Sequence, residues 1–235
     1  MGAWDHLIDF GTALGKGVVS VGEDLVGGVE RTAQGLGTSG TARMSEIGTE
    51  NAYLVDILIA LVKSAPDAPE NPLFKIITRI LEAYYEKFPE DALQKIYKTA
   101  AIGAGYMAGR MIIGKKLAEA IAKRLIARIA ASTAFKQLAT KLGVSAAAGS
   151  TGVGIVITLV MVQGVGQRAS KASKRLKARN RKLWDALRTE KGLDMLYFLV
   201  EEPMSKYMDA IDMATNHATL FEQELKDVYG KAHGN

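Results

Sequence analysis

The chain has 235 residues, no cysteine and a formal net charge of +5. Its length is enough to bury a hydrophobic core without covalent cross-links, and the lack of cysteine excludes a disulfide framework, a thiolate metal site and a cysteine nucleophile. Residues 98–182 carry 17 basic side chains and one acidic side chain, whereas residues 1–97 carry 8 and 14, and residues 183–235 carry 5 and 10. A basic, apolar centre thus lies between two acidic flanks, which can screen it in one folded state.

Composition divides the chain into four regions. We expect a Gly-rich N-terminal segment at 1–48, an acidic helical region at 49–97, a basic, apolar, membrane-active region at 98–182 and acidic C-terminal helices at 183–235. The N-terminus carries Asp5 and Asp9 where a Sec signal peptide is positively charged, and no apolar stretch follows. We therefore predict synthesis in soluble form in the cytoplasm, without a Sec signal.

Helix is the expected secondary structure almost throughout, because strand-like alternation and Asn-Gly or Asp-Gly hairpin turns are missing from the sequence. The predicted fold class is therefore all-α, a multi-helix bundle that buries Gly/Ala-rich apolar helices in the soluble state. In chain order, the apolar spacing predicts a weak, Gly-interrupted helix at 4–34, a loop at 35–48 and helices at 50–64, 72–87, 90–113, 115–131 and 203–229. Residues 168–190 are basic and helix-prone.

The run from Leu142 to Gln167 carries no charge. As a helix it would span about 39 Å, more than the hydrocarbon core of a bilayer. Its strongly apolar part supplies the candidate membrane-insertion residues Val153, Ile155, Val156, Ile157, Leu159, Val160, Met161 and Val162. The alternative to membrane insertion is a helix buried on all sides in a soluble bundle. The segment can be buried in the bundle in one state and inserted in the membrane in another. A re-entrant hairpin broken near the glycines also stays open.

Small residues recur four apart in this run and in a second apolar segment, Thr99–Gly114. Such spacing lets helices pack backbone to backbone, as in membrane helix pairs. The predicted helix-packing positions are Ala101, Gly105, Gly109, Gly149, Gly152 and Gly154. Thr99–Gly114 is short for a span, and its central Arg110 costs about 2.5–3.5 kcal/mol on insertion, so we do not expect it to span constitutively.

A dense basic cluster follows the uncharged run. Beside an apolar segment, it predicts a juxtamembrane site for anionic lipid. Its members are Arg168, Lys171, Lys174, Arg175, Lys177, Arg179, Arg181 and Lys182. Nucleic-acid binding is one alternative, although no aromatic residue occurs before Trp184 for base stacking. A solvated helix face that pairs with the acidic flanks is the other.

Signals for an enzyme are poor. "GLGTSG" at residues 35–40 matches a dinucleotide-binding pattern, but no strand precedes it, and "GRMIIGKK" at 109–116 lacks the Ser/Thr that would hold magnesium in a P-loop. The three histidines, His6, His217 and His233, are too scattered for a metal cluster or a catalytic triad. We therefore predict no enzymatic activity, no catalytic residue, no cofactor and no metal.

The segments "TAAIGAGYMAGRMIIG" and "AAAGSTGVGIVITLVMVQGVG" resemble the buried hydrophobic hairpin of pore-forming colicins. The chain is similar in size and style to the small ion-selective pore-forming effectors of the Gram-negative type VI secretion system. Its opening, "AWDHLIDFGTALGKGVVSVGEDLVGGV", also resembles the Gly-rich N-termini of such effectors. The resemblance covers residues 3–35 and 97–182, and Arg110 departs from an uncharged hairpin.

This resemblance implies a secreted antibacterial toxin that inserts into the inner membrane of a target cell and depolarises it by ion leakage. It implies an anionic lipid membrane, a cognate immunity protein and a secretion-tube or chaperone protein as partners, and homo-oligomers in the membrane. Two other classes stay open. One is a nucleic-acid-binding or phage structural protein, which we favour less, and the other is a non-catalytic helical adaptor.

Overall fold

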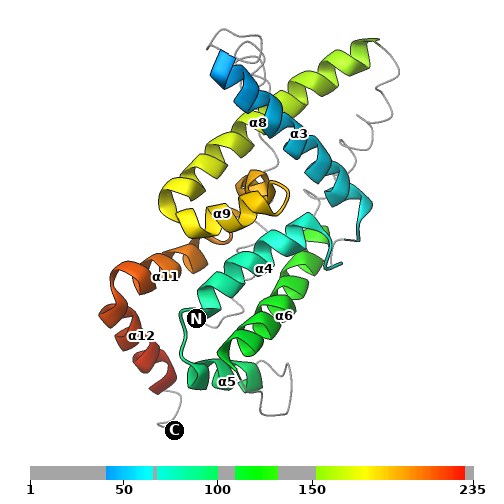
Figure 1. Ribbon diagram of the computed structural model, residues 1–235. Coiled ribbons are helices and arrows are strands. Elements are labelled where there is room, and N and C mark those ends of the chain that lie inside the picture. The colour runs from blue at the N-terminus through cyan, green and yellow to red at the C-terminus, as the bar shows by residue number, and fades with distance from the viewer. Residues whose placement is uncertain (1–40, 66–67, 100–108, 132–151, 231–235) are drawn as a thin grey trace. The chain divides into compact units, whose positions relative to one another are not determined.

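The structure, a computed structural model, describes residues 41–65, 68–99, 109–131 and 152–230 (Figure 1). These residues form nine α-helices and one 3-10 helix, and they contain no strand. The expected all-α, multi-helix fold is therefore confirmed for this part of the chain. The predicted weak helix at 4–34 lies outside the described residues.

The chain divides into two compact units, and each unit is assembled from two separate stretches of sequence. The first unit takes its residues from Met1–Ile76 and Leu125–Pro203, and the second from Ile77–Arg124 and Met204–Asn235. The four regions predicted from composition are consecutive, whereas these units interleave. Each unit therefore has a core that residues distant in sequence build together.

Helix α3 (Thr41–Lys63) begins well before the predicted start at residue 50. Ile47, Leu54 and Leu61 are buried and lie seven residues apart, so they share one face of the helix. Ile47 already belongs to this buried face, so the helix extends toward the N-terminus beyond the predicted start. The predicted loop at 35–48 is therefore wrong from residue 41 onward.

Helix α4 (Pro72–Tyr85) begins at the proline predicted to open it. The side-chain oxygen of Asn71 accepts a hydrogen bond from the Leu73 backbone N–H at 2.9 Å, which caps the helix. Asn71 is fully buried, and its amide nitrogen donates to Ser64 Oγ at 3.0 Å. The helix stops ahead of Pro89, as predicted, and α5 (Glu90–Thr99) follows.

The predicted helix at 90–113 is wrong. Helix α5 ends at Thr99, and α6 (Arg110–Ala131) begins after Gly109, whose φ of +98° lies outside the right-handed helical region. The Gly109 N–H instead donates to Glu90 Oε1 at 3.2 Å. A packing stripe with helical spacing cannot continue through Gly109, and its other predicted members, Ala101 and Gly105, lie outside the described residues.

Helix α6 includes the predicted basic amphipathic helix at 115–131 and starts five residues earlier. Leu117 and Leu125 are buried on its inner face, as the apolar spacing predicts. Lys116, Lys123 and Arg124 are exposed. The helix is therefore amphipathic, with its apolar face buried and its basic residues exposed, as the sequence predicts.

Helix α8 (Gly152–Arg179) joins the strongly apolar part of the uncharged run to the basic cluster without a break. Asn180, with φ −147° and ψ 90°, separates it from α9 (Arg181–Thr189). Its side-chain oxygen accepts a hydrogen bond from the Leu183 N–H at 3.0 Å, so that it caps α9. The helix-prone stretch at 168–190 is thus helical, and it is divided between α8 and α9 because Asn180 leaves the helical conformation.

The C-terminal residues form four short helices, namely η2 (Leu193–Leu196), α10 (Tyr197–Val200), α11 (Ser205–Asn216) and α12 (Ala218–Gly230). A single helix at 203–229 is therefore a wrong prediction. The break falls at His217, whose φ of −139° departs from helical geometry. Helices α11 and α12 pack against each other.

A group of aromatic rings packs together in the second unit, beside buried aliphatic side chains such as Ile80 and Leu93. The ring of Tyr84 lies edge-on to the rings of Phe88 and Tyr207, with centroids 4.7 and 5.2 Å apart. Phe88 also lies edge-on to Phe221, with centroids 5.6 Å apart. These contacts connect the C-terminal end of α4 with α11 and α12, and such pairs add to the stability that burial provides.

Candidate functional site

Helix α8 is the central helix of the first unit, where it packs against α3, α9, η2 and α10 (Figure 1). The side chains that its C-terminal half buries are small, apart from one leucine: Ala169, Ser170, Ala172, Ser173 and Leu176. Small side chains let neighbouring helices approach closely. Their spacing of three and four residues is helical, and this signal for a buried face is present in the sequence beneath the more conspicuous lysines and arginines.

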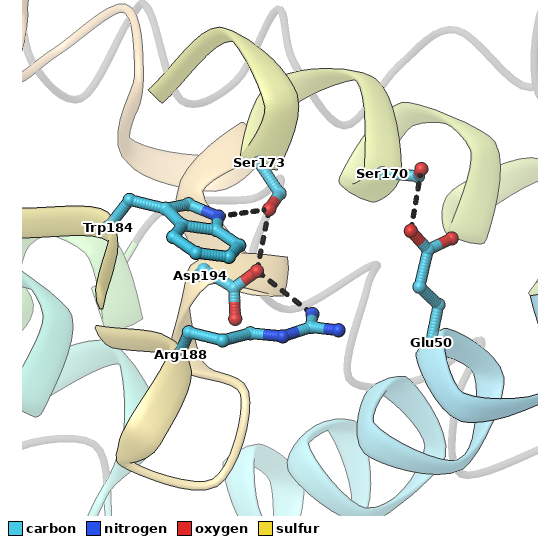
Figure 2. Close-up of polar contacts among 6 residues, drawn as sticks. All are labelled: Glu50, Ser170, Ser173, Trp184, Arg188 and Asp194. Carbon is cyan, nitrogen blue, oxygen red and sulfur yellow. Dashed lines mark hydrogen bonds and ion pairs between the residues drawn. The ribbon is translucent and has the colours of Figure 1, made fainter. Parts of the chain in front are cut away.

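A buried carboxylate lies where α8, α9 and η2 meet. Asp194 in η2 has no exposed surface, and its Oδ2 accepts a hydrogen bond from Ser173 Oγ at 2.6 Å (Figure 2). Arg188 Nη1 in α9 forms an ion pair with the same oxygen at 3.1 Å. The indole N–H of Trp184 donates to Ser173 Oγ at 2.9 Å. One serine of α8 is therefore bonded to both α9 and η2.

The guanidinium of Arg188 also lies over aromatic rings. It is 5.1 Å from the ring centroid of Tyr53 in α3 and 5.9 Å from that of Trp184. Gly192, at φ +74°, makes the turn into η2, and a Cβ there would lie 2.9 Å from Tyr53 Cβ. Only glycine fits this turn, which brings η2 against α3.

A second buried hydrogen bond attaches α8 to α3. Ser170 Oγ donates to Glu50 Oε1 at 3.0 Å, and both residues are buried (Figure 2). Ser170 and Ser173 are three residues apart and carry the bonds on the inner side of α8. We call the six residues of Figure 2 the polar anchor: Glu50, Ser170, Ser173, Trp184, Arg188 and Asp194.

Sequence reasoning missed the polar anchor. Ser170 and Ser173 lie inside the stretch read as a basic cluster, and Asp194 and Glu50 lie far from it in sequence. The alternation of serines with lysines in "RASKASKR" is the one available signal, since it places small polar residues on the face opposite the charges. No pattern in the sequence indicates which acids they contact.

Most of the predicted lipid-binding residues lie on the surface. Arg168 is half-buried, with its guanidinium 5.5 Å from the ring centroid of Phe198. The other seven are exposed, five on α8 and two on α9: Lys171, Lys174, Arg175, Lys177, Arg179, Arg181 and Lys182. Lys171, Lys174 and Arg175 are three and four residues apart and therefore share one face, which we call the basic face of α8.

Some of these cations have partners within the protein. Arg175 forms two hydrogen bonds with the Glu201 carboxylate, from Nε at 2.7 Å and from Nη2 at 2.5 Å. This hydrogen bonding, opposed by partial burial, raises the pKa of the Arg175 guanidinium above its ordinary value. Lys177 Nζ lies 4.3 Å from the ring centroid of Trp184. Glu201, in the acidic C-terminal flank, thus neutralises part of the basic cluster. This pairing is what we expect if the cluster is a solvated helix face that pairs with the acidic flanks.

The candidate insertion residues lie in the N-terminal half of α8, where the backbone is helical from Gly152 onward. Gly154 lies in the first turn of this helix, and Gly149 lies outside the described residues. The helix is continuous through Gln167 in this structure, and a re-entrant hairpin in a membrane stays a prediction. Among the residues that the structure describes, no helix has both the length and the apolar character needed to cross a membrane.

The described residues contain no group of His, Asp or Glu side chains arranged to bind a metal ion. The polar anchor has two carboxylates, and each of them bonds a serine of α8. Its arrangement suits the attachment of a helix. No family model, curated protein or solved structure matches this chain.

Proposed function

We propose that the protein is a membrane-inserting, pore-forming toxin that depolarises the inner membrane of a target bacterium by ion leakage. The observation that carries the proposal is the continuity of α8. Its first half is uncharged through Gln167, and its second half presents Lys171, Lys174 and Arg175 on one exposed face. An apolar helix continued by a basic helix is suited to insertion into an anionic bilayer.

Electrostatics supplies the first step. Each lysine or arginine near an anionic surface contributes about 1 kcal/mol of attraction. The basic face therefore draws the protein to the membrane, and Arg175 contributes less because Glu201 already pairs with it. The uncharged half of α8 then exchanges its surroundings in the protein for lipid.

The polar anchor opposes this second step. Moving α8 into lipid breaks the hydrogen bonds of Ser170 and Ser173 and separates them from Glu50 and Asp194. A net hydrogen bond contributes about 1 kcal/mol, and one to a charged group contributes up to about 3 kcal/mol. In this proposal the polar anchor keeps α8 in the soluble fold until membrane contact compensates for its loss.

The biological setting of the proposal comes from the resemblance to secreted pore-forming effectors. It consists of secretion, delivery by a secretion-tube or chaperone protein, protection of the producer by a cognate immunity protein, and oligomers in the target membrane. Each of these partners is tested separately from membrane activity, for example by co-purification from a producing cell.

Release of a trapped dye or of potassium from liposomes tests the proposal. The full chain should release the contents of vesicles made from equimolar phosphatidylcholine and phosphatidylglycerol. Ile157→Asp should abolish release, because a charge within an inserted helix costs about 2.5–3.5 kcal/mol. Gly152→Asp should also abolish it, because it puts a charge into the uncharged run Leu142–Gln167. Ile157→Val keeps the residue apolar, and Gln223→Asp adds a charge at an exposed position of α12. Both controls should release normally.

Full release by both aspartate variants would overturn insertion through α8. The basic face also fits a nucleic-acid backbone, so the same proteins are assayed for DNA binding at two salt concentrations. Intact vesicles together with strongly salt-dependent DNA binding would favour the nucleic-acid alternative. A stable protein that affects neither would favour the helical adaptor.

A further inference from the structure

The start of α6, in the second unit, exposes two large apolar side chains in succession. Met111 is 77% exposed and Ile112 is 53% exposed. Among the side chains whose burial the structure describes, Leu220 is the other large apolar residue that is exposed. A pair of adjacent exposed apolar residues at the beginning of a well-packed helix needs an explanation, because burial elsewhere in this unit is extensive.

The exposure is imposed by the packing of α6. Ile113 and Leu117, on the inner face, have no exposed surface. Gly114 lies so close to α4 that a Cβ there would be 3.2 Å from Tyr85 Cβ. Turning the helix to cover Met111 would withdraw Ile113 from the core. The outward direction of the pair therefore follows from the inner face of the same helix.

Basic side chains surround this apolar pair. Lys115 follows Met111 by four residues, and Lys116 follows Ile112 by four, so all four share the outer face of α6. Arg110 is exposed directly before the pair. Two acids are close: Glu119 lies 4.0 Å from Lys116, and Glu90 accepts a hydrogen bond from the N–H of Gly109, next to Arg110. We call Arg110, Met111, Ile112, Lys115 and Lys116 the α6 tip.

We propose that the α6 tip is a second membrane-contact site, which inserts Met111 and Ile112 shallowly between the headgroups of an anionic lipid surface. Exposed apolar side chains beside lysine and arginine are the chemistry of interfacial membrane binding. A protein partner fits less well, because a stable protein interface buries about 800 Å² on each side, far more than two side chains supply.

This site differs from the predicted lipid site on α8 in residues, helix and unit. It also changes the role of Thr99–Gly114, whose last residues belong to a rigid surface helix with the apolar pair outward. The inference rests on the proposed function only in that both need an anionic membrane. Binding and leakage are therefore measured separately.

Sedimentation of the full chain with vesicles tests the proposal. One set of vesicles is equimolar phosphatidylcholine and phosphatidylglycerol, and the other is phosphatidylcholine alone. The double variant Met111→Ser/Ile112→Ser should bind the anionic vesicles at least about tenfold more weakly, because it loses the apolar contact. Arg110→Gln/Lys115→Gln/Lys116→Gln should bind anionic vesicles roughly fivefold more weakly per charge and keep a reduced preference for them, because the basic face of α8 is unchanged.

Leu220→Ser is the matched control, because Leu220 is 55% exposed on α12 and has Glu222 and Glu224 close by in sequence in place of basic residues. It should bind like the unmodified protein. Thermal unfolding by circular dichroism verifies that all three proteins stay folded, as expected for exposed positions. Equal binding by the Met111/Ile112 variant and the Leu220 variant would overturn the α6 tip as a membrane contact.

The two proposals fail in different ways. If the unmodified protein binds anionic vesicles through the α6 tip but releases nothing, the pore fails and the contact site stands. If it releases vesicle contents and the Met111/Ile112 variant binds normally, the contact site fails and the pore stands. Ile157→Asp should keep its binding while losing release.

Discussion

The two compact units differ in what holds their central elements. In the first unit, the C-terminal half of α8 buries small side chains, and hydrogen bonds of the polar anchor attach it to α3, α9 and η2. In the second unit, edge-on aromatic pairs such as Phe88 and Phe221 pack beside buried aliphatic side chains. Apolar burial stabilises whatever the exact partners are, whereas a buried polar network depends on every member. The attachment of α8 through Ser170 and Ser173 therefore depends on specific partners to a degree that the aromatic packing does not.

The largest expected effect is in the aromatic core. Phe88→Ala should lower the free energy of unfolding by about 4 kcal/mol, because it removes a buried ring and leaves a cavity. Urea denaturation of the full chain, followed by circular dichroism, measures this loss. Phe88→Leu should cost clearly less. A loss below about 1 kcal/mol for the alanine variant would contradict a core built on these rings.

The next effect breaks the polar anchor. Asp194→Ala should lower the free energy of unfolding by about 3 kcal/mol, because it leaves Arg188 without its buried partner. Asp56→Ala, at an exposed position of α3, should change it by less than about 0.5 kcal/mol. The same urea titration, read by the fluorescence of Trp184 in a Trp4→Phe background, follows the loss at the site itself.

Leakage sharpens this second test. If the polar anchor restrains α8, the Asp194 variant should release vesicle contents faster than the Phe88 variant at a comparable loss of stability. Equal or slower release by the Asp194 variant would mean that the polar anchor only stabilises the first unit. The difference between the two units would then affect the stability of the fold and would not affect membrane insertion.

The smallest effect concerns alkaline pH. Burial, reinforced by the Glu201 carboxylate, raises the pKa of Tyr197 from its ordinary value to about 12. The neutral phenol is therefore favoured in the folded state. Its contribution to stability is fully present below about pH 10, the unfolded value, and is lost as the pH rises through about 12. The unmodified protein should lose stability over this interval relative to Tyr197→Phe, as urea denaturation at stepped pH can measure. Parallel pH profiles for the two proteins would contradict the shift.

Local signals predicted the helices well where a single residue controls a boundary. Pro72 opens α4 and Pro89 precedes α5, because proline fixes the backbone and lacks the N–H that continues a helix. Gly109, Asn180 and His217 break helices that periodicity alone extended through them. Each of these residues is also found inside helices, so its presence alone does not predict a break. At Asn180 the break is made by a local cap on Leu183, and at Gly109 by a positive φ and a hydrogen bond to Glu90.

The sequence by itself determined the all-α class, the lack of charge through Gln167 and the concentration of basic residues after it, since these follow from composition and apolar spacing. Only the tertiary structure decided that Ser170 and Ser173 meet Glu50 and Asp194, and that Met111 and Ile112 point outward. The reason is physical. Which face of a helix is buried depends on what packs against it, and the acids that bond the serines lie 120 and 21 residues away along the chain.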